Sequence, residues 1–151
     1  MAVFTKLLKG DIENFISDYS IGNLDSFEEI VDGIENSNFK IICNNQPYIL
    51  TIFEKRVTEE DLPFFMNLKN FLNKNNFKCP KTISDKNGKI LKRIKNKTAV
   101  IISFLEGKSI EKPNSKMCRE VGKMVANLHN LTINFSFVVF ICTFKCYHFT
   151  F

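Results

Sequence analysis

A short segment containing glycine and asparagine, placed between two strand-like runs, has residue types that could bind phosphate. Gly33 can adopt backbone angles that other residues avoid. Asn36, Ser37 and Asn38 follow it with small polar side chains and exposed amides, and such a turn can lie over phosphates. Glycine and asparagine also favour simple hairpin turns. The segment therefore has two interpretations, a phosphate-binding turn and a plain hairpin turn.

Groups suited to acid–base or metal chemistry are sparse toward the end of the sequence. No Asp or Glu follows Glu120, so residues 121–151 offer no carboxylate for proton transfer or for Mg2+. Cys142, Cys146 and His148 could bind zinc, but no fourth ligand lies nearby. The five cysteines are odd in number and irregularly spaced, which argues against a disulfide framework. We expect neither a metal site nor a catalytic residue in this chain.

The composition is that of an ordinary globular protein. The 151 residues, of which 44% are apolar and 25% charged, suffice for one domain or for one lobe of something larger. The sequence opens without a secretory signal, so we expect a cytoplasmic protein. Basic residues cluster only over residues 89–97, which favours a solvated hairpin over a nucleic-acid site. The uncharged run Leu131–Phe144 is shorter than the about 20 residues of a membrane helix, so we expect no membrane association.

Strand-like runs dominate the first two thirds of the chain. An amphipathic helix precedes them, and Gly22 stands where it could end. The apolar residues of this helix are Leu8, Ile12, Phe15, Ile16 and Tyr19. Five antiparallel strands are expected over residues 27–31, 38–43, 48–53, 90–94 and 98–104. Turn residues lie at 44–47 and 85–88.

Two further helices are expected. The first begins at Thr58, whose hydroxyl could cap it together with Asp61. Its apolar stripe consists of Leu62, Phe65, Leu68 and Leu72. The last helix is capped by Asn114 or Ser115. Its apolar face consists of Met117, Val121, Met124, Val125 and Leu128.

Four segments in a fixed order indicate a family. They are FEEIVDGIENSNF (27–39), YILTIFEKR (48–56), DLPFF (61–65) and FLEG (104–107). Together they resemble homoserine kinases of the aminoglycoside-phosphotransferase-like superfamily, and the resemblance extends from residue 1 to about residue 131. It implies an α+β fold, the small lobe of the protein-kinase-like architecture. In that lobe a helix packs on a five-stranded antiparallel sheet, with an N-terminal helix and a linker helix added.

The resemblance also implies an activity and a site. Such kinases transfer the γ-phosphoryl group of ATP, with Mg2+, to the side-chain hydroxyl of L-homoserine, a step toward threonine. Thr51 occupies the position where other kinases carry a phosphate-binding lysine, and Phe65 lies near the position of its partner glutamate. Lys55 and Arg56 are either phosphate-neutralising groups or surface charges. The implied nucleotide-binding residues are Gly33, Asn36, Ser37, Asn38, Thr51 and, through their backbone at the hinge, Ser103 and Leu105.

The catalytic carboxylates of the superfamily come after the hinge, from a His-Gly-Asp type loop and a later Asp. His129-Asn130-Leu131 is not that loop, because no Asp follows it. We therefore expect a small lobe with hinge (1–107), a linker helix (108–131) and an aberrant apolar tail (132–151), as if the gene were interrupted near Leu131.

The leading hypothesis is a truncated homoserine kinase that is inactive alone. One alternative is a noncatalytic nucleotide-binding remnant, which could pair with a separately encoded second lobe. Another is a small-molecule kinase of the same superfamily with a different acceptor.

Overall fold

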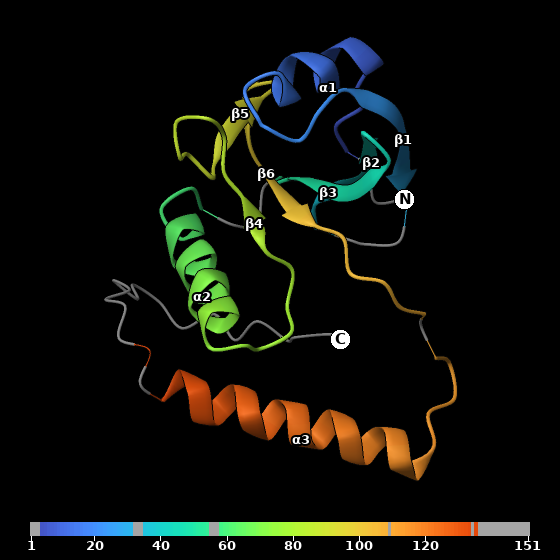
Figure 1. Cartoon of the computed structure of the whole chain (residues 1–151), viewed down its shortest axis with the longest axis vertical. Helices are drawn as coiled ribbons and strands as arrows, with labels where there is room; N and C mark the ends of the chain where they lie inside the picture. The colour runs from blue at the N-terminus through green and yellow to red at the C-terminus, as the bar shows by residue number, and fades with distance from the viewer. Residues whose placement is uncertain (1–3, 32–34, 55–57, 109, 134, 136–151) are drawn as a thin grey trace.

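The computed structural model describes residues 4–31, 35–54, 58–108, 110–133 and 135. Over these ranges six antiparallel strands form one sheet in the order β1-β2-β3-β6-β4, and β5 pairs with β6 (Figure 1). The strands are β1 (Leu24–Ile30), β2 (Ser37–Cys43), β3 (Gln46–Ile52), β4 (Thr82–Ile83), β5 (Lys92–Ile94) and β6 (Lys97–Ser103). The helices are α1 (Lys9–Ile16), α2 (Leu62–Lys74) and α3 (Ser115–Thr132). The predicted α+β class is confirmed, with the short β4 as an additional strand.

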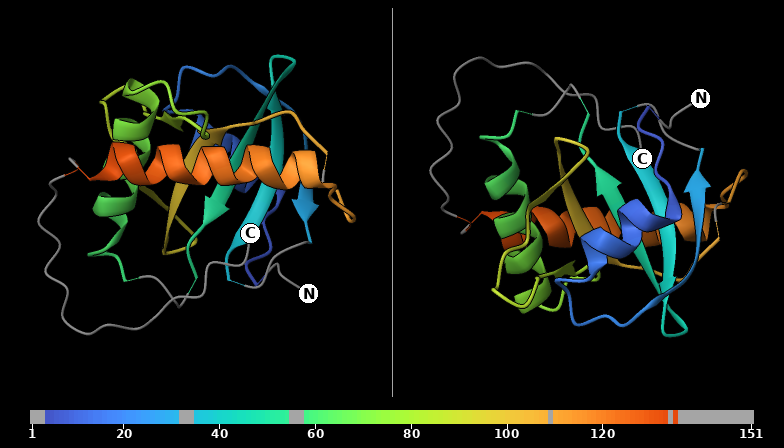
Figure 2. Two further views of the ribbon diagram at one scale, coloured as in Figure 1. Left: turned by 90° about the horizontal axis from the view of Figure 1, so that it is seen from below. Right: turned by 90° about the horizontal axis from the view of Figure 1, so that it is seen from above.

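The main hydrophobic core lies between the sheet and α1. Side chains alternate along β2, so Ser37, Phe39, Ile41 and Cys43 are buried while the residues between them are partly exposed. The core residues of α1 are Ile12, Phe15 and Ile16. Figure 2 shows α1 on one side of the sheet and α3 on the other. The sheet thus has a first face, covered by α1, and a second face on the side of α3.

The residue that enters the core just before α1 is Leu7, whereas the sequence pattern predicted Leu8. The Asp11 carboxylate accepts a hydrogen bond from the backbone N–H of Leu8 at 2.8 Å, so the helix begins at Lys9. The Leu8 side chain is 74% exposed, and its predicted place on the apolar face is wrong. Leu7 is buried instead, because the chain enters the helix in an extended conformation.

The tight turns use residues in the left-handed region. Asn44 and Asn45 have φ of 46° and 61° and join β2 to β3, so the predicted turn at residues 44–47 is shorter than expected. The hairpin between β5 and β6 turns at Lys95 and Asn96, with φ of 49° and 63°. The predicted turn at residues 85–88 exists, and it lies in the loop between β4 and β5. There Asp85 accepts hydrogen bonds from the N–H groups of residues 87 and 89.

Helix α2 buries a different stripe from the predicted one. Its buried residues are Leu62, Met66 and Leu72. Phe65 is 40% exposed and Leu68 is only partly buried. The helix begins at Leu62 rather than Thr58, because the Thr58 hydroxyl donates to the Asp61 carboxylate at 2.7 Å and caps no backbone group. The covered face is therefore rotated relative to the predicted stripe.

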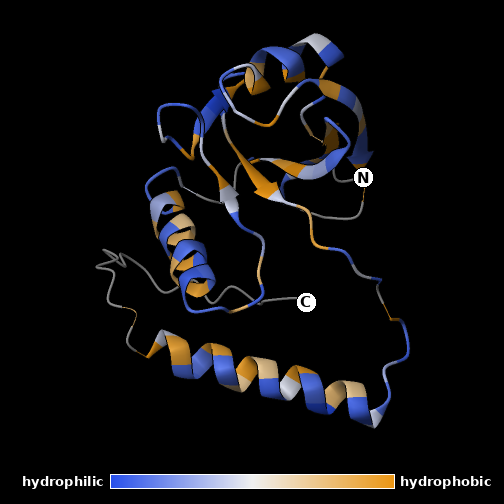
Figure 3. Ribbon diagram, in the orientation of Figure 1, coloured by the Kyte–Doolittle hydropathy of each residue, from blue (hydrophilic) through white to orange (hydrophobic). Residues whose placement is uncertain are grey.

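Helix α3 is capped as predicted, but it contains no buried residue. The Asn114 side-chain oxygen accepts from the N–H of Met117 at 3.0 Å. None of the residues of α3 is buried, and Figure 3 shows apolar and polar positions alternating around it. Just beyond the helix, the Phe135 ring lies 4.9 Å from that of Phe71 and 5.8 Å from that of Phe64, both on α2.

Substitution of Tyr19 by phenylalanine is expected to leave the free energy of unfolding unchanged or to raise it by up to about 1 kcal/mol. Tyr19 is 3% exposed, and its hydroxyl has no hydrogen-bond partner among the described residues. Its pKa is strongly raised, mainly by burial. Urea denaturation of both proteins measures the difference, with Tyr48→Phe at a partly buried tyrosine as the matched control. Destabilisation by more than 1 kcal/mol would mean that the hydroxyl has a partner after all.

Candidate functional site

A polar pair lies on the second face of the sheet, where β2 and β3 run side by side. Asn38 is the register partner of Thr51. The Thr51 hydroxyl donates a hydrogen bond to the Asn38 side-chain oxygen at 2.8 Å, and both side chains are partly buried. This bond orients the side-chain NH2 group of Asn38, which has no acceptor among the described residues. The pair therefore presents hydrogen-bond donors on the second face of the sheet, where Lys40 also lies, two residues from Asn38.

Ser37 points to the other face of the sheet. Its side chain is fully buried, and its Oγ accepts hydrogen bonds from the N–H groups of Phe4 and Thr5 at 2.9 and 3.0 Å. The same hydroxyl donates to the Glu54 carboxylate at 2.6 Å. The Ser37 side chain is thus fully engaged, and any contribution to ligand binding comes from its backbone.

Asn36 directly precedes Ser37 and is partly buried. Residues 36–38 and Thr51 therefore lie together at one end of the sheet. Gly33 lies outside the described residues, as do Lys55 and Arg56.

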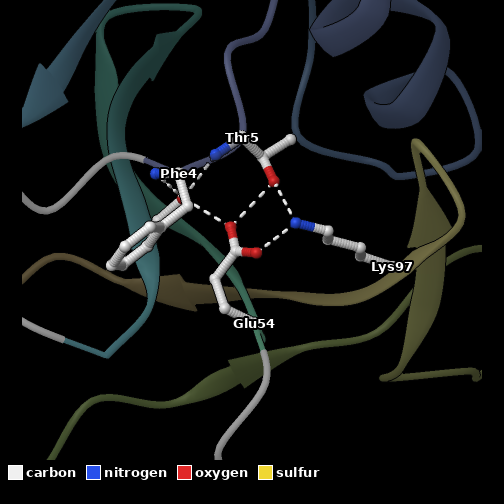
Figure 4. Close-up of polar contacts among 5 residues, drawn as sticks. Phe4, Thr5, Glu54 and Lys97 are labelled. Carbon is white, nitrogen blue, oxygen red and sulfur yellow. Dashed lines mark hydrogen bonds and ion pairs between the residues drawn. The ribbon is translucent and has the colours of Figure 1, made fainter.

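A buried ionic network that sequence reasoning missed adjoins Ser37 (Figure 4). The Glu54 side chain is 6% exposed and forms an ion pair with Lys97. It also accepts a hydrogen bond from the Thr5 hydroxyl at 2.7 Å, and Lys97 donates to that hydroxyl at 2.8 Å. Burial acts to raise the pKa of Glu54, but hydrogen bonds from Lys97, Ser37 and Thr5 outweigh this effect, and the pKa is lowered.

Strand periodicity could have located the network. Leu50 and Ile52 face the core, and continuing their alternation by two residues places Glu54 on the same face. Ala99 and Ile101 on β6 are likewise buried, and the same alternation places Lys97 beside them. A charge at each of these positions would be costly to bury unless it were paired. The two opposite charges therefore pair with each other.

The two predicted hinge residues lie at the end of β6, whose last residue is Ser103, and just after it, at Leu105. The Ser103 N–H donates to the Lys81 carbonyl at 2.8 Å, and the Ser103 hydroxyl accepts from the Lys81 N–H at 2.9 Å. Leu105 follows the end of the strand and is 41% exposed. Of the backbone groups expected to recognise a ligand, the Ser103 N–H is already used within the sheet.

Comparison with known proteins identifies the family. Residues 26–138 match the family described as "Phosphotransferase enzyme family". The chain belongs to this family. Similar curated proteins include the homoserine kinases of Agrobacterium fabrum and Methylobacterium radiotolerans, each 43% identical over 129 residues, and that of Rhizobium rhizogenes, 42% identical. Each alignment covers 85% of this chain and 40% of the relative, so the chain spans about two fifths of the relatives' length.

Two solved phosphotransferase structures share the fold. Amicoumacin kinase hAmiN, in complex with AMP-PNP and Ca2+, superposes with a TM-score of 0.73 at 15% identity and covers 83% of this chain and 40% of that one. Spectinomycin phosphotransferase, in complex with ADP and spectinomycin, gives 0.66 at 10% identity and covers 84% and 39%. The predicted kinase-type small lobe is therefore confirmed.

A concavity in the described part of the chain lies away from the predicted residues. It has a volume of about 610 Å3 between α2, β4 and Phe135. Its lining residues are Asn67, Asn70, Phe71, Asn73, Lys74, Lys81, Thr82 and Phe135. It includes none of the predicted site residues, and we place the candidate site at Asn38 and Thr51, where sequence and geometry coincide.

Among the described residues, no group of three or more His, Cys, Asp or Glu side chains could hold a metal ion. Cys142, Cys146 and His148 lie outside those residues. No helix in the described part of the chain has the length and apolar character needed to cross a membrane.

Proposed function

We propose that the chain is the nucleotide-binding part of a homoserine kinase, an enzyme that transfers the γ-phosphoryl group of ATP to the hydroxyl of L-homoserine on the way to threonine. The main observation in support of this proposal is the Asn38–Thr51 pair, which lies on the sheet face opposite α1, in a fold shared with kinases. The homoserine kinases at 42–43% identity support the choice of acceptor. A cytoplasmic location is part of this proposal.

The residues present fit the adenine and phosphate parts of ATP. Ile49 and Ile102 are register partners on β3 and β6, both partly exposed, on the same face as Thr51. They form an apolar surface suited to an adenine ring, and the Ser103 carbonyl and the Leu105 N–H would bond its edge. The Asn38 NH2 group would donate to a phosphate oxygen, beside Thr51, which occupies the strand position where other kinases place a lysine. ATP would supply the transferred phosphoryl group.

Mg2+ does not fit the described residues, which contain no cluster of carboxylates around the Asn38–Thr51 pair. Under the proposed division, residues 1–107 form the small lobe with its hinge, 108–131 the linker helix and 132–151 an apolar tail. Catalytic carboxylates and Mg2+ ligands would then belong to a second lobe, and a separately encoded second lobe is a candidate partner.

The 151-residue chain is expected to produce no measurable phosphohomoserine, because residues 121–151 contain no carboxylate to position the acceptor hydroxyl. The measurement is transfer of labelled phosphate from ATP to L-homoserine, with the full-length Agrobacterium fabrum relative assayed as the positive control. ATP-dependent turnover that persists through repurification and disappears in the Thr51→Val variant would contradict the expectation.

Nucleotide binding without transfer is the second candidate function, and the same lack of late carboxylates favours it. Titration of the chain with AMP-PNP tests this second function: saturable binding supports it, and the absence of binding contradicts it.

A further inference from the structure

We propose that Glu54 is a positioning residue for nucleotide binding, which acts through Ser37 to fix Asn36 and Asn38 at the site. This inference rests on the proposed function. Glu54 and Ser37 touch no ligand in this scheme. Their role is to hold the strand that carries the ligand-binding groups.

The network joins four separate parts of the chain. Glu54 lies two residues after the end of β3, and Thr5 belongs to the segment before α1 (Figure 4). Ser37 is the first residue of β2, and Lys97 is the first residue of β6. One carboxylate oxygen of Glu54 accepts from both hydroxyls, and the other pairs with Lys97. A single buried carboxylate thus ties the N-terminal segment to the start of β2 and the start of β6.

The donor and acceptor in each hydrogen bond of the Ser37 and Thr5 hydroxyls can be assigned. A serine hydroxyl has one hydrogen and two acceptor positions. The Ser37 hydrogen goes to Glu54, and both acceptor positions are filled by the N–H groups of Phe4 and Thr5. The Thr5 hydroxyl donates to Glu54 and accepts from Lys97. Every partner of the Glu54 carboxylate is therefore a hydrogen-bond donor. Residue 54 thus requires a side chain whose two polar atoms both accept hydrogen bonds. The amide of a glutamine would instead turn its N–H toward one of these donors.

Strand alternation transmits this constraint to the site. Neighbouring side chains of a strand point to opposite faces, so holding Ser37 inward holds Asn38 outward beside Thr51. A shift of one residue in the pairing of β2 would turn Asn38 into the core. Ser37 is paired with Ile52 at the end of the ladder, where fewer strand hydrogen bonds oppose such a shift.

The test compares Glu54→Gln with Glu59→Gln. Glu59 is a matched control because it also pairs with a cation, Arg93, and accepts from a threonine hydroxyl, but its side chain is 57% exposed and lies outside the network. Isothermal titration with AMP-PNP is run on the 151-residue chain at a temperature where each protein is folded. The amide and side-chain NH2 resonances of Asn36 and Asn38 are followed by NMR. Ser37→Ala is the second variant, for use if Glu54→Gln does not fold.

We expect at least tenfold weaker AMP-PNP binding in Glu54→Gln and in Ser37→Ala, with shifted resonances at Asn36 and Asn38 before ligand is added. Binding by Glu59→Gln should stay within twofold of wild type. A lower thermal midpoint with unchanged affinity in both network variants would show a merely structural role and overturn the inference, while the proposed function would stand. Absence of AMP-PNP binding by the wild-type chain would overturn the proposed nucleotide site and the inference with it.

Discussion

Replacement of Phe39 by alanine is expected to lower the free energy of unfolding by about 3 to 5 kcal/mol. Phe39 is fully buried on β2, between two other strands and under α1, and among the described residues it is the largest of the completely buried side chains. Its removal leaves a cavity that neighbours on three paired strands cannot easily fill. Domains of this size have about 5 to 15 kcal/mol of stability in total, so the loss would be a large fraction. Urea denaturation followed by circular dichroism measures it.

Phe65→Ala is the matched control for this substitution. The same aromatic ring is removed from α2, where it is 40% exposed, and we expect a loss of about 1 kcal/mol. Equal losses at the two positions would show that the core is not centred on β2, or that α2 buries more than its exposure indicates.

Glu54→Gln is expected to destabilise the chain at pH 7 by about 2 to 3 kcal/mol, because it removes the negative charge paired with Lys97 and turns an amide N–H toward one of the donors around Glu54. The partial exposure of Lys97 keeps this figure below that of a fully buried pair. The pKa of Glu54 in the folded chain is lowered from its ordinary value of 4.5. The stabilisation is therefore fully present above pH 4.5 and is lost as the pH falls through the lower folded-state pKa.

The difference between wild type and Glu54→Gln should consequently shrink as the pH falls below 4.5. Asp11, Asp18 and Glu59 also have lowered pKa values, owing mainly to hydrogen bonds from Lys95, Lys92 and Thr98 respectively, but they titrate in both proteins and cancel in the difference. Denaturation curves at several pH values between 3 and 7 measure the effect. A difference that stays constant through this range would mean that the Glu54 charge does not stabilise the fold.

Local patterns predicted the elements with strong sequence signals. Alternating apolar residues located β2 and β3, and asparagine chemistry located both their turn and the cap of α3 at Asn114. The two-residue β4 has too few residues to show alternation, and it exists because its partner β6 is already in place. The stripe of α2 was misassigned because Phe65 and Met66 are both apolar and helical spacing permits either. Tertiary packing alone selects Met66.

The sequence could predict which residues of the candidate site lie near one another, but it did not predict the direction in which each side chain points. The resemblance placed Asn36, Ser37, Asn38 and Thr51 near one another, and the strand register does the same. Adjacent residues of a strand cannot both face one ligand, so Ser37 and Asn38 must have different roles. That constraint follows from β geometry once the strand limits are known. Strand alternation could have placed Glu54 on the core face, but the role proposed for it depends on contacts with Thr5, Ser37 and Lys97, which lie far away in sequence.

The lack of buried residues in α3 determines what an unfolding experiment on this chain reports. An isolated helix of this length is marginal in water, because most helical stability comes from packing an apolar face. Apart from the contact of Phe135 with α2, the packing that holds the described chain together lies in the sheet, α1 and α2. We expect these elements to unfold as one cooperative unit, and we expect the backbone hydrogen bonds of α3 to open separately, because no residue of α3 is buried. The free energies of unfolding measured for the variants above therefore belong to the sheet unit, and the helical signal of α3 contributes a sloping baseline to the transition.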